Sequence, residues 1–453
     1  MASTAQSLPP LRAREDVDAL FARLAPDPAW SFAHCTPRET TRLTHGYHRY
    51  PAKFIPQLVD RLLDEYLPRA SDACVNDPFM GSGTTLVCAV ERGYRATGTD
   101  VNEVACLIAR AKATPLHPQR LQAFLAGWTE EVEAALAGRG PAQAEGEAPA
   151  PGPPIPAHER LDYWFPPQQK RDLGVILGAI RRVEDEDLQT FLLCCFSHIL
   201  KNCSLWAAGS TKPTRSRTKR PAEAWPTFLR HLQRMVRRNA AFWAAVPPKV
   251  RAAPHTYVDI RCQDARRQPW PDASADILIT SSPYVTSYEY ADLHQLTALW
   301  LSVVQDLRAF RAKFIGTGSP LVERPLCIRS PLGQATARAL WARDERLGLA
   351  VGHFFMDMEE TFREAWRILK PGARACYVIG NTRLKGVDVL NAQVFAEGLL
   401  LAGFSLERVI LREIPSKILP QTRDPRTGRF TSPRNAHFHA YPVEYIVVAR
   451  KGP

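Results

Sequence analysis

The chain has 453 residues, of which 45% are hydrophobic and 23% charged. This is ordinary globular composition, and the length exceeds a usual single domain, so we expect a core domain with a second domain or a large insertion. The 58 Lys and Arg outnumber the 46 Asp and Glu, which gives a formal net charge of +12. That excess suits a polyanionic partner, because Lys and Arg neutralise phosphates.

The cysteines and the apolar runs indicate the compartment. The ten cysteines are scattered without a C-x-x-C pair, and Cys194 and Cys195 lie in an apolar stretch, as is typical of reduced thiols inside a cytoplasmic protein. The N-terminus lacks an apolar segment of signal-peptide length, and no run reaches the roughly 18 apolar residues of a membrane span. We therefore expect a cytoplasmic protein with no membrane partner.

The first half of the chain begins as a mixed, partly helical lead-in over residues 1–45. From Val75 the pattern predicts a short strand, the glycine-containing segment Asp77–Thr85, a helix, a strand that ends at Asp100, and a helix from Asn102. A strand, a glycine turn, a helix and a strand with an acidic residue at its tip typically open a doubly wound α/β sheet.

This pattern breaks at residues 138–157, which are rich in Pro, Ala and Gly and predict a linker or an exposed loop. Residues 158–250 have helical periodicity, and from His255 strands and helices alternate again, with a helix stop at residues 369–372 before the strand that follows. We predict one α/β sheet interrupted by a helical insertion, with a first half at residues 1–113, linker and insertion at 114–254, and a second half at 255–453.

The segment Asp77–Thr85 carries the strongest signal in the first half. Gly81 and Gly83 allow a tight turn after a strand and a close approach by a ligand, and the following helix presents its N-terminal amides to an anionic group. A phosphate-binding P-loop is excluded because the chain contains no Gly-Lys dipeptide, and the dinucleotide pattern fails because Leu86 replaces its third glycine. The alternative is a simple tight turn.

Asp100 follows at the tip of the next strand, within Gly98-Thr99-Asp100-Val101-Asn102. A carboxylate at this place can accept both ribose hydroxyls of an adenosine. It can equally cap the helix that begins near Asn102, and the two roles are compatible.

These segments resemble the amino-methylating DNA methyltransferases. Asp77-Pro78 followed by FMGSG resembles their motif I, the segment 98–102 their motif II, and Tyr50-Pro-Ala-Lys-Phe54 their motif X, while Asp264 matches the position of motif III, where a simple loop cap is the alternative. The resemblance implies a Rossmann-like methyltransferase fold with S-adenosylmethionine as cofactor. It implies cofactor-binding roles for Tyr50, Lys53, Phe54, Asp77, Pro78, Phe79, Gly81, Gly83, Thr84, Asp100, Asn102 and Asp264.

Ser281-Ser282-Pro283-Tyr284 ends an apolar strand and resembles motif IV of the same family. There the cytosine-N4 members typically read Ser-Pro-Pro-Tyr and most adenine-N6 members Asp-Pro-Pro-Tyr, so Ser282 departs from the usual proline. The resemblance implies that these four residues are catalytic. Ser281 would hold the exocyclic amine, and Tyr284 would stack on a base extruded from the duplex. A surface turn is the alternative. The interpretation requires the loops at 81–83 and 281–284 to face each other across one cleft.

The target that this pattern predicts is the N4 atom of cytosine in duplex DNA. Cytosine-C5 chemistry is excluded because it needs a thiolate placed after a proline, and none of the ten cysteines follows one. Adenine N6 is the nearest alternative; an RNA guanine-N2 or protein-glutamine methyltransferase and a catalytically inactive DNA-binding subunit are further ones. His294 is a possible general base, with a structural role as the favoured interpretation.

Two basic segments are candidates for binding the DNA backbone. The first has no apolar anchor and predicts a mobile loop, with a solvated loop as its alternative. The helical insertion at 158–254, or residues 305–350, would read the bases. No nuclease motif stands out, so a restriction endonuclease would be a separate protein, and neither the recognition sequence nor the oligomeric state can be predicted. The cations are Lys212, Arg215, Arg217, Lys219 and Arg220 in the first segment, and Arg423, Arg426 and Arg429 in the second.

Overall fold

A computed structural model describes most of the chain. No helix in the described part is long and apolar enough to cross a bilayer. The described ranges are 14–50, 54–67, 72–138, 155–210, 212–285, 290–317, 324–414 and 443–453, without the side chains of residues 14–16 and 290.

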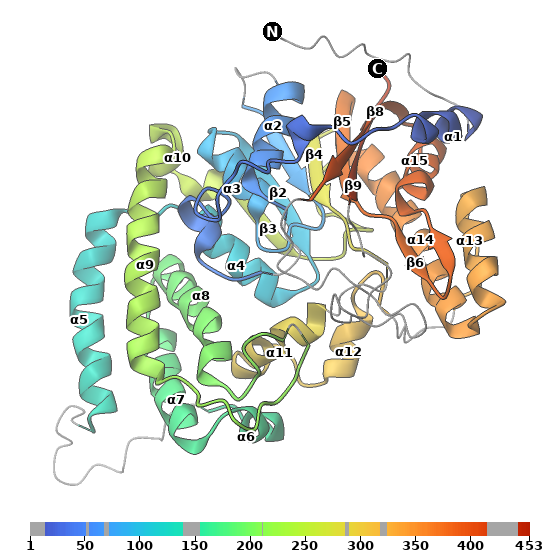
Figure 1. The fold of residues 1–453 in the computed structure, drawn as a ribbon. Helices are drawn as coiled ribbons and strands as arrows, with labels where there is room; N and C mark the ends of the chain where they lie inside the picture. Colours follow the sequence, from blue (N-terminus) through green and yellow to red (C-terminus); the bar gives the residue numbers. More distant parts are fainter. Residues whose placement is uncertain are drawn as a thin grey trace.

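A seven-stranded sheet forms the centre of the molecule (Figure 1). Its order is β3-β2-β1-β4-β5-β9-β8; the pairs from β3 to β5 are parallel, and β9 is antiparallel to both of its neighbours. This arrangement confirms the predicted α/β sheet. The strands are β1 (Cys74–Asp77), β2 (Arg95–Asp100), β3 (Val258–Cys262), β4 (Ala275–Ser281), β5 (Leu369–Ile379), β8 (Ser405–Glu413) and β9 (Val443–Arg450).

Helices cover both faces of the sheet, because successive strand side chains point to opposite sides. In β4, Ile277 and Ile279 pack with one group of helices, whereas Leu278 packs with a second group on the other face. The sheet is therefore doubly wound, as predicted. The first group is α2 (Pro56–Tyr66), α3 (Thr84–Glu91) and α4 (Glu103–Ala113); the second is α1 (Arg14–Ala22), α13 (Pro331–Trp341), α14 (Glu345–Ile368) and α15 (Asn391–Leu401).

A bundle of helices separates β2 from β3 in the sequence, although these two strands are hydrogen-bonded neighbours in the sheet. The bundle has its own apolar core around Trp128, Phe196 and Phe228, and this core continues onto Trp300. Figure 1 shows α5 and α9 side by side to the left of the sheet. The helices are α5 (Pro118–Leu136), α6 (Glu159–Trp164), α7 (Pro167–Arg181), α8 (Glu186–Cys203), α9 (Ala224–Ala245) and α10 (Pro248–Ala252), joined by α11 (Tyr290–Trp300) and α12 (Leu307–Ala312).

One predicted boundary is wrong. Residues 369–372 were expected to stop a helix ahead of the strand, but β5 begins at Leu369 itself and pairs there with Ala275. A register shift between Ala275 and Ile277 accommodates these residues, and Gly372 has a φ of +76°. The remaining short elements are η1 (Pro28–Trp30), η2 (Leu43–Gly46), η3 (Pro254–Thr256), β6 (Thr382–Leu384) and β7 (Val387–Val389).

Candidate active site

The turn after β1 needs its glycines. Gly81 and Gly83 have φ values of +49° and +77°, a region that disfavours side chains. A Cβ atom at Gly83 would also lie 2.9 Å from the Cβ of Ala109 on α4. The turn therefore brings α3 close against α4 and starts α3 immediately after Gly83.

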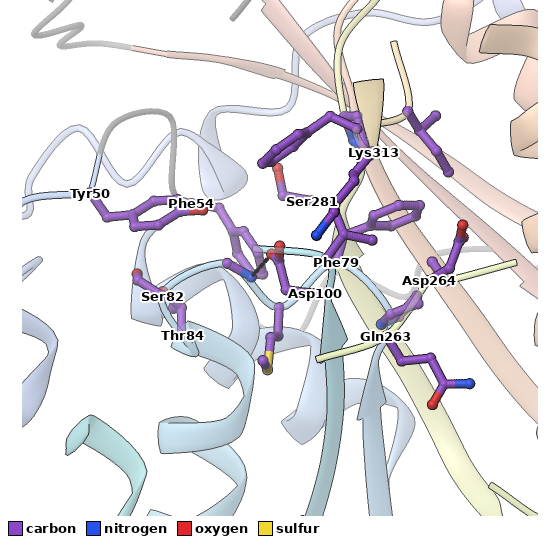
Figure 2. Close-up of a pocket in the computed structure, with 18 residues that line it drawn as sticks. Tyr50, Phe54, Phe79, Ser82, Thr84, Asp100, Gln263, Asp264, Ser281 and Lys313 are labelled. Carbon is purple, nitrogen blue, oxygen red and sulfur yellow. Dashed lines mark hydrogen bonds between the residues drawn. The ribbon is translucent and has the colours of Figure 1, made fainter. Parts of the chain in front are cut away.

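Asp100, at the end of β2, fixes this turn from the neighbouring strand. Its Oδ2 accepts a hydrogen bond from the Gly81 backbone N–H at 3.1 Å (Figure 2). Its Oδ1 accepts one from the Asn102 N–H at 2.8 Å. Burial raises the pKa of this carboxyl to about 7, despite the two hydrogen bonds that favour its charged form. Asp100 is thus a carboxylate at the pocket wall with fixed orientation.

Asp77 connects the glycine turn to the strand that carries Ser281. The Asp77 Oδ1 accepts hydrogen bonds from the Phe79 N–H at 3.1 Å and from the Thr280 hydroxyl of β4 at 2.7 Å. Burial raises the pKa of Asp77 to about 6. This buried contact holds the end of β1 and the end of β4 at a fixed separation.

The four residues of the predicted catalytic loop point in different directions. Ser281 and Pro283 line the pocket. Ser282 is buried, and its hydroxyl donates to the Val378 carbonyl at 3.3 Å. The Tyr284 hydroxyl donates to Glu444 Oε1 on β9 at 2.9 Å, and Tyr284 is not among the pocket-lining residues.

One pocket, with about 780 Å³ of empty volume, joins the glycine turn to the Ser281 loop. The spatial prediction that the loops at 81–83 and 281–284 share a cleft is therefore confirmed. Figure 2 shows Ser281 above Asp100, with Tyr50 and Phe54 on one side and Asp264 on the other. Of the predicted residues, Tyr50, Phe54, Pro78, Phe79, Gly81, Thr84, Asp100, Asp264, Ser281 and Pro283 line the pocket.

Other predicted cofactor residues lie behind this lining. Asp77 and Gly83 support the turn, as described above, and Asn102 is buried. The Asn102 side chain accepts a hydrogen bond from the Val104 N–H and donates to Nδ1 of His294 at 2.7 Å. Lys53 lies outside the described residues.

His294 is a buried support residue in this geometry. Its ring packs against Tyr50 with centroids 4.8 Å apart, and burial lowers its pKa to about 4. A neutral imidazole bonded to Asn102 fits the structural role that was favoured for His294.

The pocket also contains residues that no motif indicated. Lys313, Phe314 and Ile315 follow α12 and line the wall near Ser281, and Gln263 lines it beside Asp264. Gln263 directly precedes Asp264, so the motif match at Asp264 could have indicated Gln263 as a pocket residue. The α12 segment carries no motif, and only the fold brings it to the pocket.

The first basic segment is anchored more firmly than predicted. The Lys219 ammonium donates to the carbonyls of Lys201 and Trp206, both at 2.7 Å, and Arg215 Nε donates to the Tyr163 carbonyl at 2.9 Å. These two cations are therefore held by polar contacts, in a segment predicted to lack an apolar anchor. Lys212, Arg217 and Arg220 are exposed, whereas Arg423, Arg426 and Arg429 lie outside the described residues.

Comparisons with known proteins point to the same chemistry. A family model described as DNA methylase, of the N6/N4 type, matches residues 15–111, which include the glycine turn and Asp100. The Type II methyltransferase M.MvaI of Kocuria varians is 25% identical over 407 residues, covering 85% of this chain and 87% of that protein. The Type II methyltransferase M.MjaII of Methanocaldococcus jannaschii is 43% identical over 88 residues, which is 19% of this chain and 16% of that protein.

The part of the chain that holds the glycine turn is thus similar to the amino-methylating DNA methyltransferases, and most of the chain is similar to a Type II methyltransferase. The protein is accordingly a DNA methyltransferase of the N6/N4 type. Among solved structures, a putative DNA modification methylase from Thermus thermophilus, complexed with S-adenosylmethionine, is 17% identical over 42% of this chain and 54% of that chain, with a TM-score of 0.21.

The pocket of this DNA methyltransferase fits S-adenosylmethionine, the methyl donor of the family. Phe54, Phe79 and Ile315 supply apolar surface, and aromatic faces also attract a cationic sulfonium. The Asp100 carboxylate suits ribose hydroxyls. The Ser82 hydroxyl lines the pocket and has no hydrogen-bond partner among the described residues, so it can donate to a ligand.

Proposed function

We propose that this enzyme transfers a methyl group from S-adenosylmethionine to the N4 atom of a cytosine extruded from duplex DNA. The observation that carries the proposal is the shared pocket, which has the glycine turn and Asp100 at one end and Ser281 at the other. A serine at the start of this loop is the residue type that the resemblance associates with cytosine N4.

The cofactor end of the pocket would hold the adenosine and the methionine part. Asp100 would accept the ribose hydroxyls, and Asp264, whose carboxylate is paired with Arg266 at 2.6 Å, would face the adenine. Tyr50 and Phe54 would contact the methionine part. When bound, the cofactor supplies an electrophilic methyl group on a sulfonium.

The target end must make a poor nucleophile reactive. The lone pair of an exocyclic amine is delocalised into the base ring. Hydrogen bonds from the amine to the Ser281 hydroxyl and to a carbonyl of the same loop would favour a tetrahedral nitrogen and free the lone pair. Because the loop is fixed by Asp77 and Thr280, positioning supplies much of the rate.

Tyr284 would stack on the extruded base. Its hydroxyl is bound to Glu444, and Arg412 Nη1 lies 3.3 Å from the other oxygen of that carboxylate. The ring is therefore held at one edge, which limits its rotation. A base that leaves the duplex needs such a surface to replace its lost stacking.

The duplex would be gripped by exposed cations of the insertion. Lys212, Arg217 and Arg220 are exposed, whereas Lys219 is better placed to support the segment than to bind phosphate. The names of the two curated relatives, both Type II methyltransferases, support a role in restriction–modification, with any endonuclease as a separate protein.

The test is to incubate the protein with S-adenosylmethionine labelled in the methyl group and with duplex DNA, and then to digest the DNA to nucleosides. We expect the label in N4-methyl-2′-deoxycytidine. Label in N6-methyl-2′-deoxyadenosine would contradict the base assignment, and label that appears only when RNA replaces DNA would contradict the substrate class.

A further inference from the structure

The helical insertion carries two groups of cations, one that forms ion pairs with carboxylates and one that does not. In the described residues, cations of α5 and α7 form ion pairs, including Arg120 with Asp185 and Arg182 with Glu131. Residues 201–238 contain ten Lys and Arg but a single carboxylate. None of these ten cations takes part in an ion pair with another described residue.

Some of the ten donate to backbone carbonyls and others do not, although Arg230 donates to the Thr227 hydroxyl at 3.3 Å. Lys201, Lys219, Arg215 and Arg238 donate to backbone carbonyls. The cations that are exposed to solvent and donate to no carbonyl are Lys212, Arg217, Arg220, Arg230, Arg234 and Arg237.

Three of the exposed arginines form a stripe along α9. Arg230, Arg234 and Arg237 are spaced four and three residues apart, so they lie on one helix face. The opposite face is buried through Phe228, His231, Leu232, Met235 and Phe242. This arginine stripe (Arg230, Arg234, Arg237) is about 10 Å long, since a helix rises about 1.5 Å per residue.

Contacts between α9 and the lead-in connect the stripe with the pocket. His231 Nε2 donates to the Tyr47 carbonyl at 2.7 Å. Arg49 lies two residues beyond Tyr47, is exposed, and directly precedes the pocket-lining Tyr50. The flank of α9 next to the stripe therefore packs against the segment that ends at the pocket wall.

The rings of His198 on α8 and His231 on α9 stack with centroids 3.7 Å apart, and the ring of His48, which directly precedes Arg49, packs edge-on against His198 with centroids 5.5 Å apart. Burial and the neighbouring histidines lower the pKa of His198, and the charges of Arg49 and Arg234 lower it further. The segment that carries Arg49 therefore packs onto the histidine pair that includes His231 of α9. Arg49 and Arg234 come from distant parts of the chain, are exposed, and form no ion pair with another described residue.

We propose that the arginine stripe and Arg49 bind the sugar–phosphate backbone of duplex DNA and hold it beside the pocket that receives the extruded base. The inference rests on the proposed function. A stripe of about 10 Å matches about three base-pair rises of 3.4 Å along one strand. Arginines that contact phosphates also release the counterions that are condensed on the DNA. Since phosphates carry no sequence information, the stripe contributes equally to all sequences.

The test compares two variants that each lose three charges. The stripe variant is Arg230→Ala/Arg234→Ala/Arg237→Ala, and the control is Arg120→Ala/Arg171→Ala/Arg182→Ala on α5 and α7. Affinity for a fluorescent duplex oligonucleotide is measured across a salt series. The same preparations are titrated with S-adenosylmethionine, which checks that the pocket is intact.

A plot of log affinity against log salt concentration has a negative slope, and we expect the stripe variant to reduce its magnitude by about 2 to 3, because each phosphate contact contributes about 0.9. Its affinity for any duplex sequence falls roughly tenfold or more at moderate salt, while cofactor affinity is unchanged and the control stays close to the wild type.

Equal slopes for the stripe and control variants would refute the inference while leaving the proposed function intact, provided that the wild type methylates duplex DNA. A loss of affinity for single-stranded RNA but not for duplex DNA would also refute it. A wild type that neither binds nor methylates duplex DNA refutes the proposed function itself.

Discussion

Residues 47–50 connect the pocket with the helix that carries the arginine stripe, yet the two regions are built differently. Around the pocket the key polar groups are held in place: Asp77 binds Thr280, and Asp100 binds the Gly81 and Asn102 amides. On α9 the three arginines of the stripe are exposed and have no ion-pair partner among the described residues.

The difference reflects two physical tasks. Moving a methyl group requires two atoms at a set distance and angle, so the side chains that hold them must have fixed partners. Attracting a polyanion requires positive charge near its surface, and mobile side chains provide it. The pocket should therefore be sensitive to single atoms, and the stripe only to its total charge.

The largest expected effect is at Ser281. Ser281→Ala removes the hydroxyl that would hold the amine, and we expect the rate of methyl transfer to fall by about 100-fold or more, as when one transition-state hydrogen bond is lost. Cofactor affinity should not change. Single-turnover transfer of a labelled methyl group to DNA measures the rate.

Ser282→Ala is the matched control, because the Ser282 hydroxyl faces the Val378 carbonyl and not the pocket. Its rate should stay within about fivefold of the wild type, the loss of one weak hydrogen bond being worth about 1 kcal/mol at most. Equal losses in the two variants would show that Ser281 has no special role.

The next effect is the pH dependence of cofactor binding. The pKa of Asp100 is raised to about 7, and the proposed acceptance of two ribose hydroxyls requires its charged form. Affinity should therefore rise about tenfold from about pH 6 to about pH 8, since the ionised fraction rises by that factor. Adenosine is the probe, because none of its groups titrates near neutral pH.

The Asp100→Asn variant is the control for that titration. It should bind adenosine more weakly, with no dependence on pH in the same interval. A pH dependence that persists in Asp100→Asn would assign the titration to another group.

A smaller effect is expected at Tyr284. Tyr284→Phe keeps the ring but removes the hydrogen bond to Glu444, and we expect a loss of about 1 kcal/mol, or about fivefold, in kcat/KM for DNA. Fluorescence of 2-aminopurine at the target position reports base extrusion directly. Unchanged kinetics and fluorescence would show that the Glu444 contact does not orient the ring.

The smallest effect is expected when the arginine stripe keeps its charge and only the shape of its side chains changes. Arg230→Lys/Arg234→Lys/Arg237→Lys keeps the charge of the stripe, so duplex affinity should stay within about threefold of the wild type. A strong loss of DNA affinity in this triple Lys variant would mean that the arginines make specific bidentate contacts.

Arg412→Lys, by contrast, changes a buried residue that contacts Glu444, and it should lower thermal stability.

The sequence was informative where chemistry demands particular residues at a short spacing. Gly81, Gly83 and Asp100 are close in the chain, and both glycines adopt the positive φ that the turn requires. The pattern thus predicted the turn, its strand and its helix correctly. Ser281 was recognisable for the same reason, because it ends an apolar strand and precedes Pro283 and Tyr284.

Contacts made over long sequence distances could not be predicted. Glu444 lies 160 residues from Tyr284, and Lys313 reaches the pocket because α12 packs beside α11. The sequence also favoured the dense cations at 212–220 over α9, since the arginines of α9 gather on one face only after the helix forms. The apolar run before Ser281 predicted strand β4, but the sequence did not predict the start of β5 at Leu369.

The central claim is that methyl donor and target amine occupy opposite ends of one pocket. Binding of a bisubstrate compound, in which a short linker joins the 5′ carbon of adenosine to N4 of a cytosine within a duplex, tests this directly. We expect affinity at least about 100-fold above that of adenosine or of the unmodified duplex, as tethering two sites predicts, with displacement of both S-adenosylmethionine and DNA. A compound that binds no more tightly than adenosine, or that displaces only the cofactor, would contradict the claim.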